Sequence, residues 1–254
     1  MTKSFNIILF GETGVGKSSL VNLIAGKEVA PISSDSDACT LSFRPYTFQV
    51  YGASYTIWDT RGFSEADTGM GGKAYLVAIE QAYKLIRELS TSGGVDLLVL
   101  CHREGRITTT TRDNYRLFYE VFCDTKVPLA IVITHLERHA RMEDWWDQNF
   151  QVFQKHEMMT ATHACVTALS GHTKSPESKQ AIESMLGQHD ENGKYNMPQV
   201  EWLRRFLQNW GRFRGRPKEL KKCDLERFLR ERCGLAIRDA REIATMMLAE
   251  RHNK

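Results

Sequence analysis

The stretch GETGVGKSS, Gly11 to Ser19, follows the apolar run FNIILF (5–10) and opens a helical pattern. It has the form G-x-x-x-x-G-K-S, in which the glycines let the backbone curl so that its N–H groups face phosphate oxygens. Lys17 adds a positive charge near the β- and γ-phosphates, and Ser18 offers a hydroxyl to Mg²⁺. The stretch therefore predicts a site for a nucleoside triphosphate, and it leaves the base and the fate of the nucleotide open.

Apolar runs and helical patterns alternate along the rest of the chain. Continuous apolar strands between helices predict an α/β fold, a mostly parallel sheet with helices on both faces. Ligands of such sheets bind at the carboxyl ends of the strands. A hairpin is expected across Gly52-Ala53. The expected strands are 5–10, 46–51, 54–59, 95–101, 128–134 and 163–168, and the expected helices are 17–25, 74–89, 111–122, 142–154 and 177–186.

A D-x-x-G motif follows the strand SYTIW, from Asp59 to Gly62. The Asp59 carboxylate is expected to hold magnesium through water, and the Gly62 N–H is expected to meet the γ-phosphate, as in the switches of GTPases. The segment SSDSDACT lies between the two motifs and ends at Thr40, which we choose over its serines as a magnesium ligand. Hydroxyls that only line a loop would look the same. This order of motifs fits GTPases better than small-molecule kinases or ABC-type ATPases.

The next apolar strand ends in ITHLE, residues 133–137. The carboxylate of Glu137 would accept the N1–H and N2–H₂ donors of guanine, whereas adenine would leave it facing an acceptor. His135 could stack on the purine, and a backbone N–H near Thr167 and Ala168 could meet guanine O6. The alternative is a plain strand end in which Thr134 caps a helix.

Together these residues resemble the septin-like GTPases, specifically the immunity-associated (GIMAP-type) branch related to the chloroplast Toc receptors. The resemblance spans about residues 5–196 and implies a P-loop GTPase fold with GTP, GDP and Mg²⁺ as ligands. The Toc receptors also place Thr-His where ITHLE stands. The features that carry the resemblance are GETGVGKSSLVNLIAG, the Ala-Cys-Thr that ends at residue 40, WDTRG, the box LLVLCHREGRIT (97–108) and HDENGKY (189–195).

The chain also departs from the pattern of this family. Ala38 replaces a usual glycine, Arg61 a common proline, and Glu137 a usual aspartate. The residue after Gly62 is Phe63, so the glutamine that orients water in Ras-like proteins is missing. We therefore expect low intrinsic turnover.

Two arginines of the box, Arg103 and Arg106, are candidates for compensating that loss. A guanidinium against the γ-phosphate stabilises the charge that develops in phosphoryl transfer. The resemblance implies G domains that pair face to face, so that a box arginine reaches the partner's site and homodimerisation stimulates hydrolysis. The alternative is a solvated loop, or an ion pair with Glu65 or Asp67.

A basic region begins at Pro198. Residues 198–254 contain 15 Lys and Arg against 8 Asp and Glu, although the whole chain has a net charge of only +3. We expect a G domain at 1–196 and an amphipathic basic helical extension at 197–254. These helices either pack on the G domain or bind an anionic membrane or a protein partner. Acidic residues interrupt the basic stretch, so no nucleic acid is expected.

Composition narrows the class of protein further. The 254 residues are 42% hydrophobic and 26% charged, and no run of 18 apolar residues occurs. The six cysteines are scattered without metal-ligand spacing, which favours reduced thiols and a cytoplasmic protein. Association with a membrane is the alternative that the basic helices of 198–254 leave open.

The predicted site is thus complete in outline. The expected function is GTP hydrolysis, with a slowly hydrolysing scaffold on a membrane or partner as the alternative; Glu137 argues against an ATPase. The expected catalytic residues are Lys17, Thr40, Gly62, Arg103 and Arg106; the magnesium ligands are Ser18, Thr40 and Asp59; and the nucleotide-binding residues are Gly11, Glu12, Thr13, Gly14, Val15, Gly16, Lys17, Ser18, Ser19, Thr40, Asp59, Gly62, His135, Glu137, Thr167 and Ala168.

Overall fold

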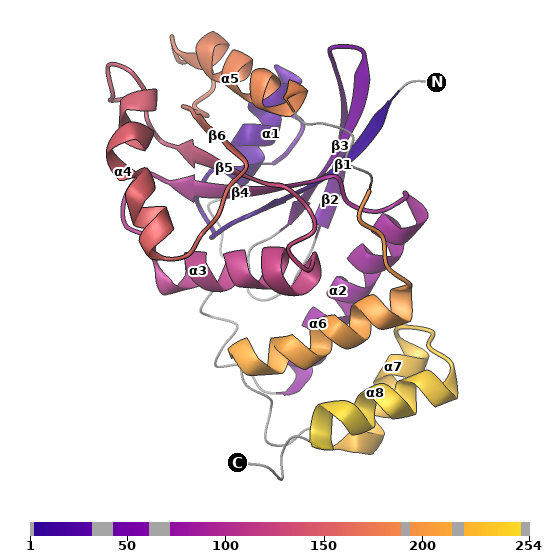
Figure 1. The fold of residues 1–254 in the computed structure, drawn as a ribbon. Helices are drawn as coiled ribbons and strands as arrows, with labels where there is room; N and C mark the ends of the chain where they lie inside the picture. The colour runs from indigo at the N-terminus through magenta and orange to yellow at the C-terminus, as the bar shows by residue number, and fades with distance from the viewer. Residues whose placement is uncertain (1–2, 32–42, 61–71, 189–193, 215–220, 250–254) are drawn as a thin grey trace. The chain divides into compact units, whose positions relative to one another are not determined.

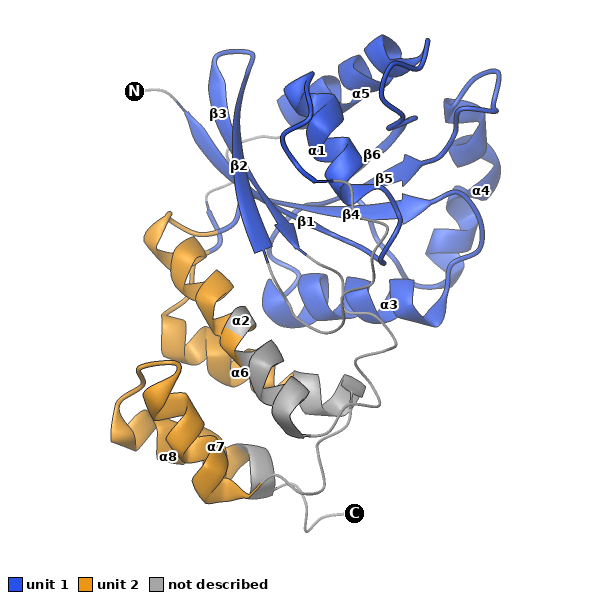
Figure 2. Ribbon diagram, turned by 180° about the vertical axis from the view of Figure 1, so that it is seen from behind, with its two compact units in different colours: residues 1–37, 43–63, 95–195 blue, residues 38–42, 64–94, 196–254 orange. Residues whose placement is uncertain are grey.

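The computed structural model describes residues 3–31, 43–60, 72–188, 194–214 and 221–249. The chain forms two compact units, which Figure 2 colours separately. One unit comprises residues 1–37, 43–63 and 95–195, and the other comprises 38–42, 64–94 and 196–254. Thr40, Gly62, Ala38, Arg61 and most of HDENGKY lie outside the described residues.

The first unit contains a six-stranded sheet of order β2-β3-β1-β4-β5-β6. β2 runs antiparallel to β3, and every other neighbouring pair is parallel. The predicted α/β class and mostly parallel sheet are confirmed. The strands are β1 Ser4–Phe10, β2 Phe43–Val50, β3 Ala53–Thr60, β4 Leu97–Arg103, β5 Leu129–Thr134 and β6 Thr162–Cys165.

Helices cover both faces of this sheet (Figure 1). α1, Lys17–Ala25, and α5, Ser175–Gly187, lie on one face; α3, Thr109–Tyr115, and α4, Glu143–Lys155, lie on the other. α3 continues as a π-helix over Arg116–Phe122, so the helix expected at 111–122 has two parts.

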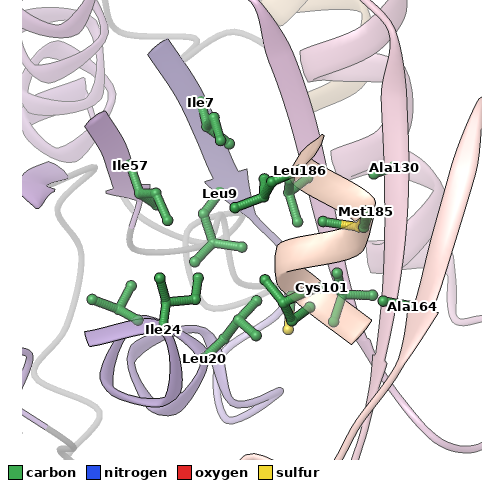
Figure 3. Packing of buried hydrophobic residues seen from close by; sticks show 14 of the residues in the cluster. Ile7, Leu9, Leu20, Ile24, Ile57, Cys101, Ala130, Ala164, Met185 and Leu186 are labelled. Atoms are coloured by element: carbon green, nitrogen blue, oxygen red, sulfur yellow. The ribbon is translucent and has the colours of Figure 1, made fainter. Parts of the chain in front are cut away.

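Alternation along the strands explains how both faces are filled. Leu9 and Cys101 point to the core beneath α1 and α5, as Figure 3 shows. The next residue of β1, Phe10, points the other way and stacks on Phe118 at 4.4 Å between ring centroids. Because successive side chains of a strand alternate between faces, a nearly continuous apolar strand is buried on both sides.

The hairpin between β2 and β3 turns at Tyr51 and Gly52, one residue before the predicted position. Both residues have positive φ, 47° and 78°, and Val50 pairs with Ala53. Two left-handed residues in succession give a turn whose twist matches that of the flanking strands. The outer strand of this hairpin, β2, forms one edge of the sheet and contains Pro45, which is tolerated there because an edge strand need not donate every N–H.

The second unit is helical. It contains α2 Gly72–Thr91, α6 Gln199–Arg214, α7 Lys222–Glu231 and α8 Ile237–Ala249, with α6 packed against α2 and α8, and α7 against α8. On α6, Leu203, Phe206 and Leu207 are buried at helical spacing, and Trp202 beside them is fully buried as well. The predicted boundary between a G domain and an extension at residue 196 stays a prediction. Within the described ranges, no helix combines the length and apolarity needed to cross a bilayer.

A buried carboxylate ties two parts of this helical unit together. Glu80 of α2 accepts hydrogen bonds from both Nε and Nη2 of Arg232 at 3.0–3.2 Å, and Lys84 lies 3.0 Å away. Burial alone would raise the pKa of Glu80, but hydrogen bonds from Lys84 and Arg232 outweigh it, so the net shift is downward. The charged form of Glu80 is therefore favoured by folding.

We expect Glu80→Gln to lower the free energy of unfolding at neutral pH by about 1 kcal/mol, since Arg232 is largely exposed and screened. A lowered pKa contributes stability above the ordinary carboxyl pKa of 4.5, and this contribution is lost as the pH falls through the folded-state value. The difference between wild type and variant in thermal unfolding should therefore shrink below about pH 4.5. Glu88→Gln, at a more exposed position of α2, is the control. A pH-independent difference would contradict the assignment.

Candidate functional site

The carboxyl ends of four neighbouring strands meet at one edge of the sheet. Leu9 of β1 lies opposite Asp59 of β3 and Val99 of β4, and Arg103 of β4 lies opposite Thr134 of β5. The P-loop (11–18), the end of β3 and the loops after β4 and β5 therefore start from the same edge. This is the place where ligands bind in such sheets.

The P-loop needs its glycines for two separate reasons. Gly11 has a φ of 148°, and a Cβ on it would lie 2.2 Å from the carbonyl oxygen of Cys101. Gly16 has a φ of 90° and caps the N-terminus of α1 in a left-handed conformation. The loop thus passes directly over β4 and turns sharply into the helix, which leaves the first N–H groups of α1 at the sheet edge.

Lys17 is held inside the loop. Its Nζ donates to the carbonyl oxygens of Gly11 at 3.0 Å and Glu12 at 2.7 Å, and the residue is only 9% exposed. Burial lowers the pKa of Lys17, although Asp59 and Glu12 favour its charged form. Because this buried ammonium is poorly hydrated, a nearby phosphate oxygen would strongly stabilise its charged form.

The carbonyl of Val15 fastens the loop to two strands. It accepts hydrogen bonds from Thr134 Oγ1 at 2.7 Å and from Cys101 Sγ at 3.3 Å. Burial raises the pKa of the Cys101 thiol to about 12, so its proton is present to be donated. The apex of the P-loop is therefore fixed to the ends of β4 and β5.

Ser18 and Asp59 meet as the two motifs predict. The Ser18 hydroxyl donates to Oδ2 of Asp59 at 3.2 Å, across 41 residues of sequence. Of the remaining P-loop residues, Thr13 and Gly14 are exposed, and Ser19 is half-buried in the first turn of α1.

His135 takes an unusual backbone conformation for a non-glycine residue, with a φ of 65°. Its Nδ1 lies 3.0 Å from Thr134 Oγ1, whose single hydrogen is donated to Val15. With that hydrogen on Val15, the contact is satisfied when Nδ1 carries a ring proton and donates it to Thr134. Burial lowers the pKa of His135, and Arg103 lowers it further. The ring packs beside Gly16, with Cε1 3.6 Å from where a Cβ would stand.

The loop after β6 lies beside Glu137. Thr167 Oγ1 lies 3.5 Å from Glu137 Oε2, while the N–H of Thr167 donates to Ser178 Oγ at 3.0 Å. Ala168 follows, half-buried. The structure thus brings together His135, Glu137 and the 167–168 loop. Thr134 caps no helix, because the next described helix begins at Glu143.

The box segment (103–108) starts at the end of β4 and leads to α3. Arg103 and Arg106 are exposed. The Glu104 N–H donates to the carbonyl of Thr134 at 3.0 Å, and the Glu104 carboxylate lies 2.8 Å from His139 Nε2. The acidic residues suggested as ion-pair partners, 65 and 67, lie outside the described residues.

Residues 6–135 match the model of a family described as 50S ribosome-binding GTPase. The match covers just over half of the chain and runs from the first strand through the P-loop and Asp59 to His135. The chain belongs to this GTPase family.

Bacterial relatives named GTPase Der share parts of this sequence. The protein from Rhizobium etli (strain CIAT 652) is 39% identical over 64 residues, which are 25% of this chain and 13% of the relative. The protein from Campylobacter curvus (strain 525.92) is 26% identical over 165 residues, 65% of this chain and 32% of the relative. The matched stretches thus span a third or less of these relatives.

Solved structures share the fold. A crystal structure of Era in complex with MgGDPNP and nucleotides 1506–1542 of 16S ribosomal RNA has a TM-score of 0.53 at 16% identity, covering 86% of this chain and 70% of that chain. A structure of the chloroplast translocon components atToc33 and psToc159 has a TM-score of 0.51 at 17% identity, covering 73% and 81%. At these identities the likeness shows the fold of P-loop GTPases.

Sequence reasoning missed the side chains that hold the loops. Cys101 entered only as part of an apolar strand, Thr134 only as a strand end or helix cap, and Glu12 only as a nucleotide-binding residue of the P-loop. In the structure the Glu12 carboxylate accepts hydrogen bonds from Thr108 and Thr111. The available signal was the run of threonines that ends the box, ITTTT (107–111).

We expect Gly11→Ala to destabilise the fold by about 3 kcal/mol, because the new Cβ would collide with the backbone of β4 in a conformation that alanine disfavours. Gly14→Ala is the matched control: φ is 79° and nothing lies within 4 Å of its Cβ, so only about 1 kcal/mol of strain is expected. Thermal unfolding without nucleotide measures both. Equal losses would contradict the close approach of Gly11 to Cys101.

Proposed function

We propose that this chain binds GTP with Mg²⁺ and hydrolyses it to GDP, and that two G domains pair to do so. One observation carries the proposal. A single sheet edge gathers a buried lysine, a serine–aspartate pair and a base pocket with a carboxylate, contributed by Lys17, Ser18 with Asp59, and Glu137.

The phosphate half of the site fits a magnesium-bound triphosphate. The hydroxyl of Ser18 and the carboxylate of Asp59 are hard oxygen donors 3.2 Å apart, the type of ligand that Mg²⁺ takes beside phosphates. When bound, the ion would neutralise charge on the β- and γ-phosphates. Lys17 and the N–H groups of the P-loop bind the same oxygens, and Thr40 and Gly62 complete the set as proposed from sequence.

The base half of the site favours guanine. A carboxylate at Glu137 accepts two donors that guanine offers and adenine lacks. The neutral ring of His135 presents an apolar face beside Gly16, suited to stacking on a purine. A backbone N–H near Ala168 is proposed to meet guanine O6, since the N–H of Thr167 already donates to Ser178 Oγ.

Catalysis needs a group in place of the missing glutamine after Gly62. Arg103 and Arg106 are exposed on the box segment, as a residue that reaches a partner's site must be. Dimerisation matters for the GTPase activity of the Toc components whose fold this chain shares. We therefore propose a homodimer with a box arginine acting in trans, and place the chain in the GIMAP-type branch on the strength of its GRIT box.

We expect Glu137→Ala to reduce the preference for GTP over ATP by about 10- to 100-fold, because the two donors of guanine lose their acceptor. Equilibrium binding of GTP and of ATP, each with Mg²⁺, measures the preference. Glu177→Ala, an exposed carboxylate at the start of α5, is the control and should leave both affinities unchanged. A Glu137→Ala protein with the full wild-type preference would end this interpretation of the base pocket.

We expect GTP turnover per molecule to rise with protein concentration. Arg103→Ala or Arg106→Ala should abolish that rise and reduce the maximal rate by about 10³-fold, in line with arginines supplied in trans. Arg141→Ala removes an arginine whose side chain is 76% exposed, and it should change neither quantity. A rate per molecule that is constant with concentration would contradict catalysis in trans.

A second candidate is a slowly hydrolysing scaffold that oligomerises on a membrane or protein partner through 198–254. The absence of a glutamine at position 63 favours it. Flotation with anionic vesicles, with and without residues 198–254, tests the membrane arm. Association with a membrane, a cytoplasmic location and the lack of nucleic-acid binding stay predictions; RNA is present in the Era structure, and only the fold of that protein is shared.

A further inference from the structure

Glu12 joins two parts of the nucleotide site through its two kinds of oxygen. Its main-chain carbonyl accepts from Lys17 Nζ at 2.7 Å. Its carboxylate Oε1 accepts from the hydroxyls of both Thr108 and Thr111. One residue of the P-loop therefore contacts the phosphate-binding ammonium on one side and the start of α3 on the other.

The hydroxyls of Thr108 and Thr111 form a binding site for the carboxylate of Glu12. Thr108 is the N-cap of α3 and accepts the N–H of Thr111 at 3.0 Å. The two hydroxyl oxygens lie 3.1 Å apart, and Thr111 is only 1% exposed. A negative charge at the N-terminus of a helix is also favoured by the helix dipole. The position of the carboxylate is thus fixed by two donors and by the helix behind them.

The box segment is fastened at both of its ends to loops of the nucleotide site. At its start, Glu104 contacts His139 of the loop after β5 at 2.8 Å. At its end, Thr108 contacts Glu12 of the P-loop. The exposed Arg106 lies between these two contacts, and the exposed Arg103 directly precedes the first of them. The segment that carries the proposed catalytic arginines therefore contacts both the loop after β5 and the P-loop, which are proposed to hold the base and the phosphates.

The position of the charged Glu12 carboxylate affects the Lys17 ammonium. The carboxylate is close enough to Lys17 to favour the charged form of that ammonium. A triphosphate needs the same ammonium, and a carboxylate that turned toward it would compete with the phosphate and repel it. Hydrogen-bond donors that hold the Glu12 carboxylate away from Lys17 would therefore maintain the affinity for nucleotide.

We propose that Thr108 and Thr111 are positioning residues of the nucleotide site, which act through the carboxylate of Glu12. The hydroxyls of Thr108 and Thr111 hold its carboxylate on the first turn of α3, which keeps the ammonium of Lys17 available to the phosphates of a triphosphate. Loss of a hydroxyl weakens triphosphate binding, and loss of the charge on Glu12 removes that penalty. This inference rests on the proposed binding of GTP.

The test is a double-mutant cycle on Thr111 and Glu12, read by the dissociation constant of GTP with Mg²⁺ in the full chain. Thr111→Val is isosteric and keeps the helix cap, which Thr108 provides. We expect it to weaken GTP binding by about 5- to 20-fold. Glu12→Gln should bind at least as tightly as wild type, and Glu12→Gln combined with Thr111→Val should bind within about twofold of Glu12→Gln alone.

The controls separate positioning from stability. Thr109→Val changes a neighbouring, exposed threonine of the same helix and should leave GTP affinity unchanged. Thermal unfolding of each variant reports on the fold, and a purely structural role for Thr111 predicts no rescue by Glu12→Gln. An unaltered affinity in Thr111→Val, or a double variant as weak as Thr111→Val, would overturn the inference. Failure of the wild-type chain to bind GTP would instead overturn the proposed function.

Discussion

The close passage of the P-loop over β4 is the constraint on which the rest of the site depends. Only glycine at position 11 lets the backbone lie against the carbonyl of Cys101. That contact brings the next carbonyls within reach of Lys17 and brings Val15 within reach of Cys101 and Thr134. The loop is therefore shaped by the strands beneath it before any ligand arrives, so binding costs less ordering of the backbone.

The two halves of the nucleotide site share one chain of hydrogen bonds. The ring of His135 donates to Thr134, and Thr134 donates to the carbonyl of Val15 in the P-loop. A threonine hydroxyl can accept and donate at once, which is why this residue type can link the two loops. The His135 ring, which is proposed to stack on the base, and the backbone of the P-loop are therefore held at a fixed spacing by these hydrogen bonds.

The sequence predicted the sheet, the P-loop and the helix that follows it, because all three depend on local patterns. α1 begins and ends where the glycine-rich motif and Gly26 indicate, and Ser18 meets Asp59 as the motif order requires. The ties that hold the loops were not predictable in the same way. The Cys101 and Thr134 contacts with Val15 span 86 and 119 residues, and nothing in a buried strand marks which polar side chain will find a backbone carbonyl. The amphipathic pattern of 197–254 likewise indicated helices with a buried face, but it could not show that α2 would be among the neighbours of α6.

The edge strand β2 bears on how copies of this protein avoid misassembly. An open strand edge offers unpaired backbone groups to any second chain, and eight residues of it would suffice for fibre-like pairing. Pro45 lacks a donor in the middle of that row, and the exposed Arg44 beside it would bring like charges together if two edges met. The opposite side of the same hairpin is fully paired with β1. Self-recognition through backbone pairing is thus disfavoured at the antiparallel end of the sheet.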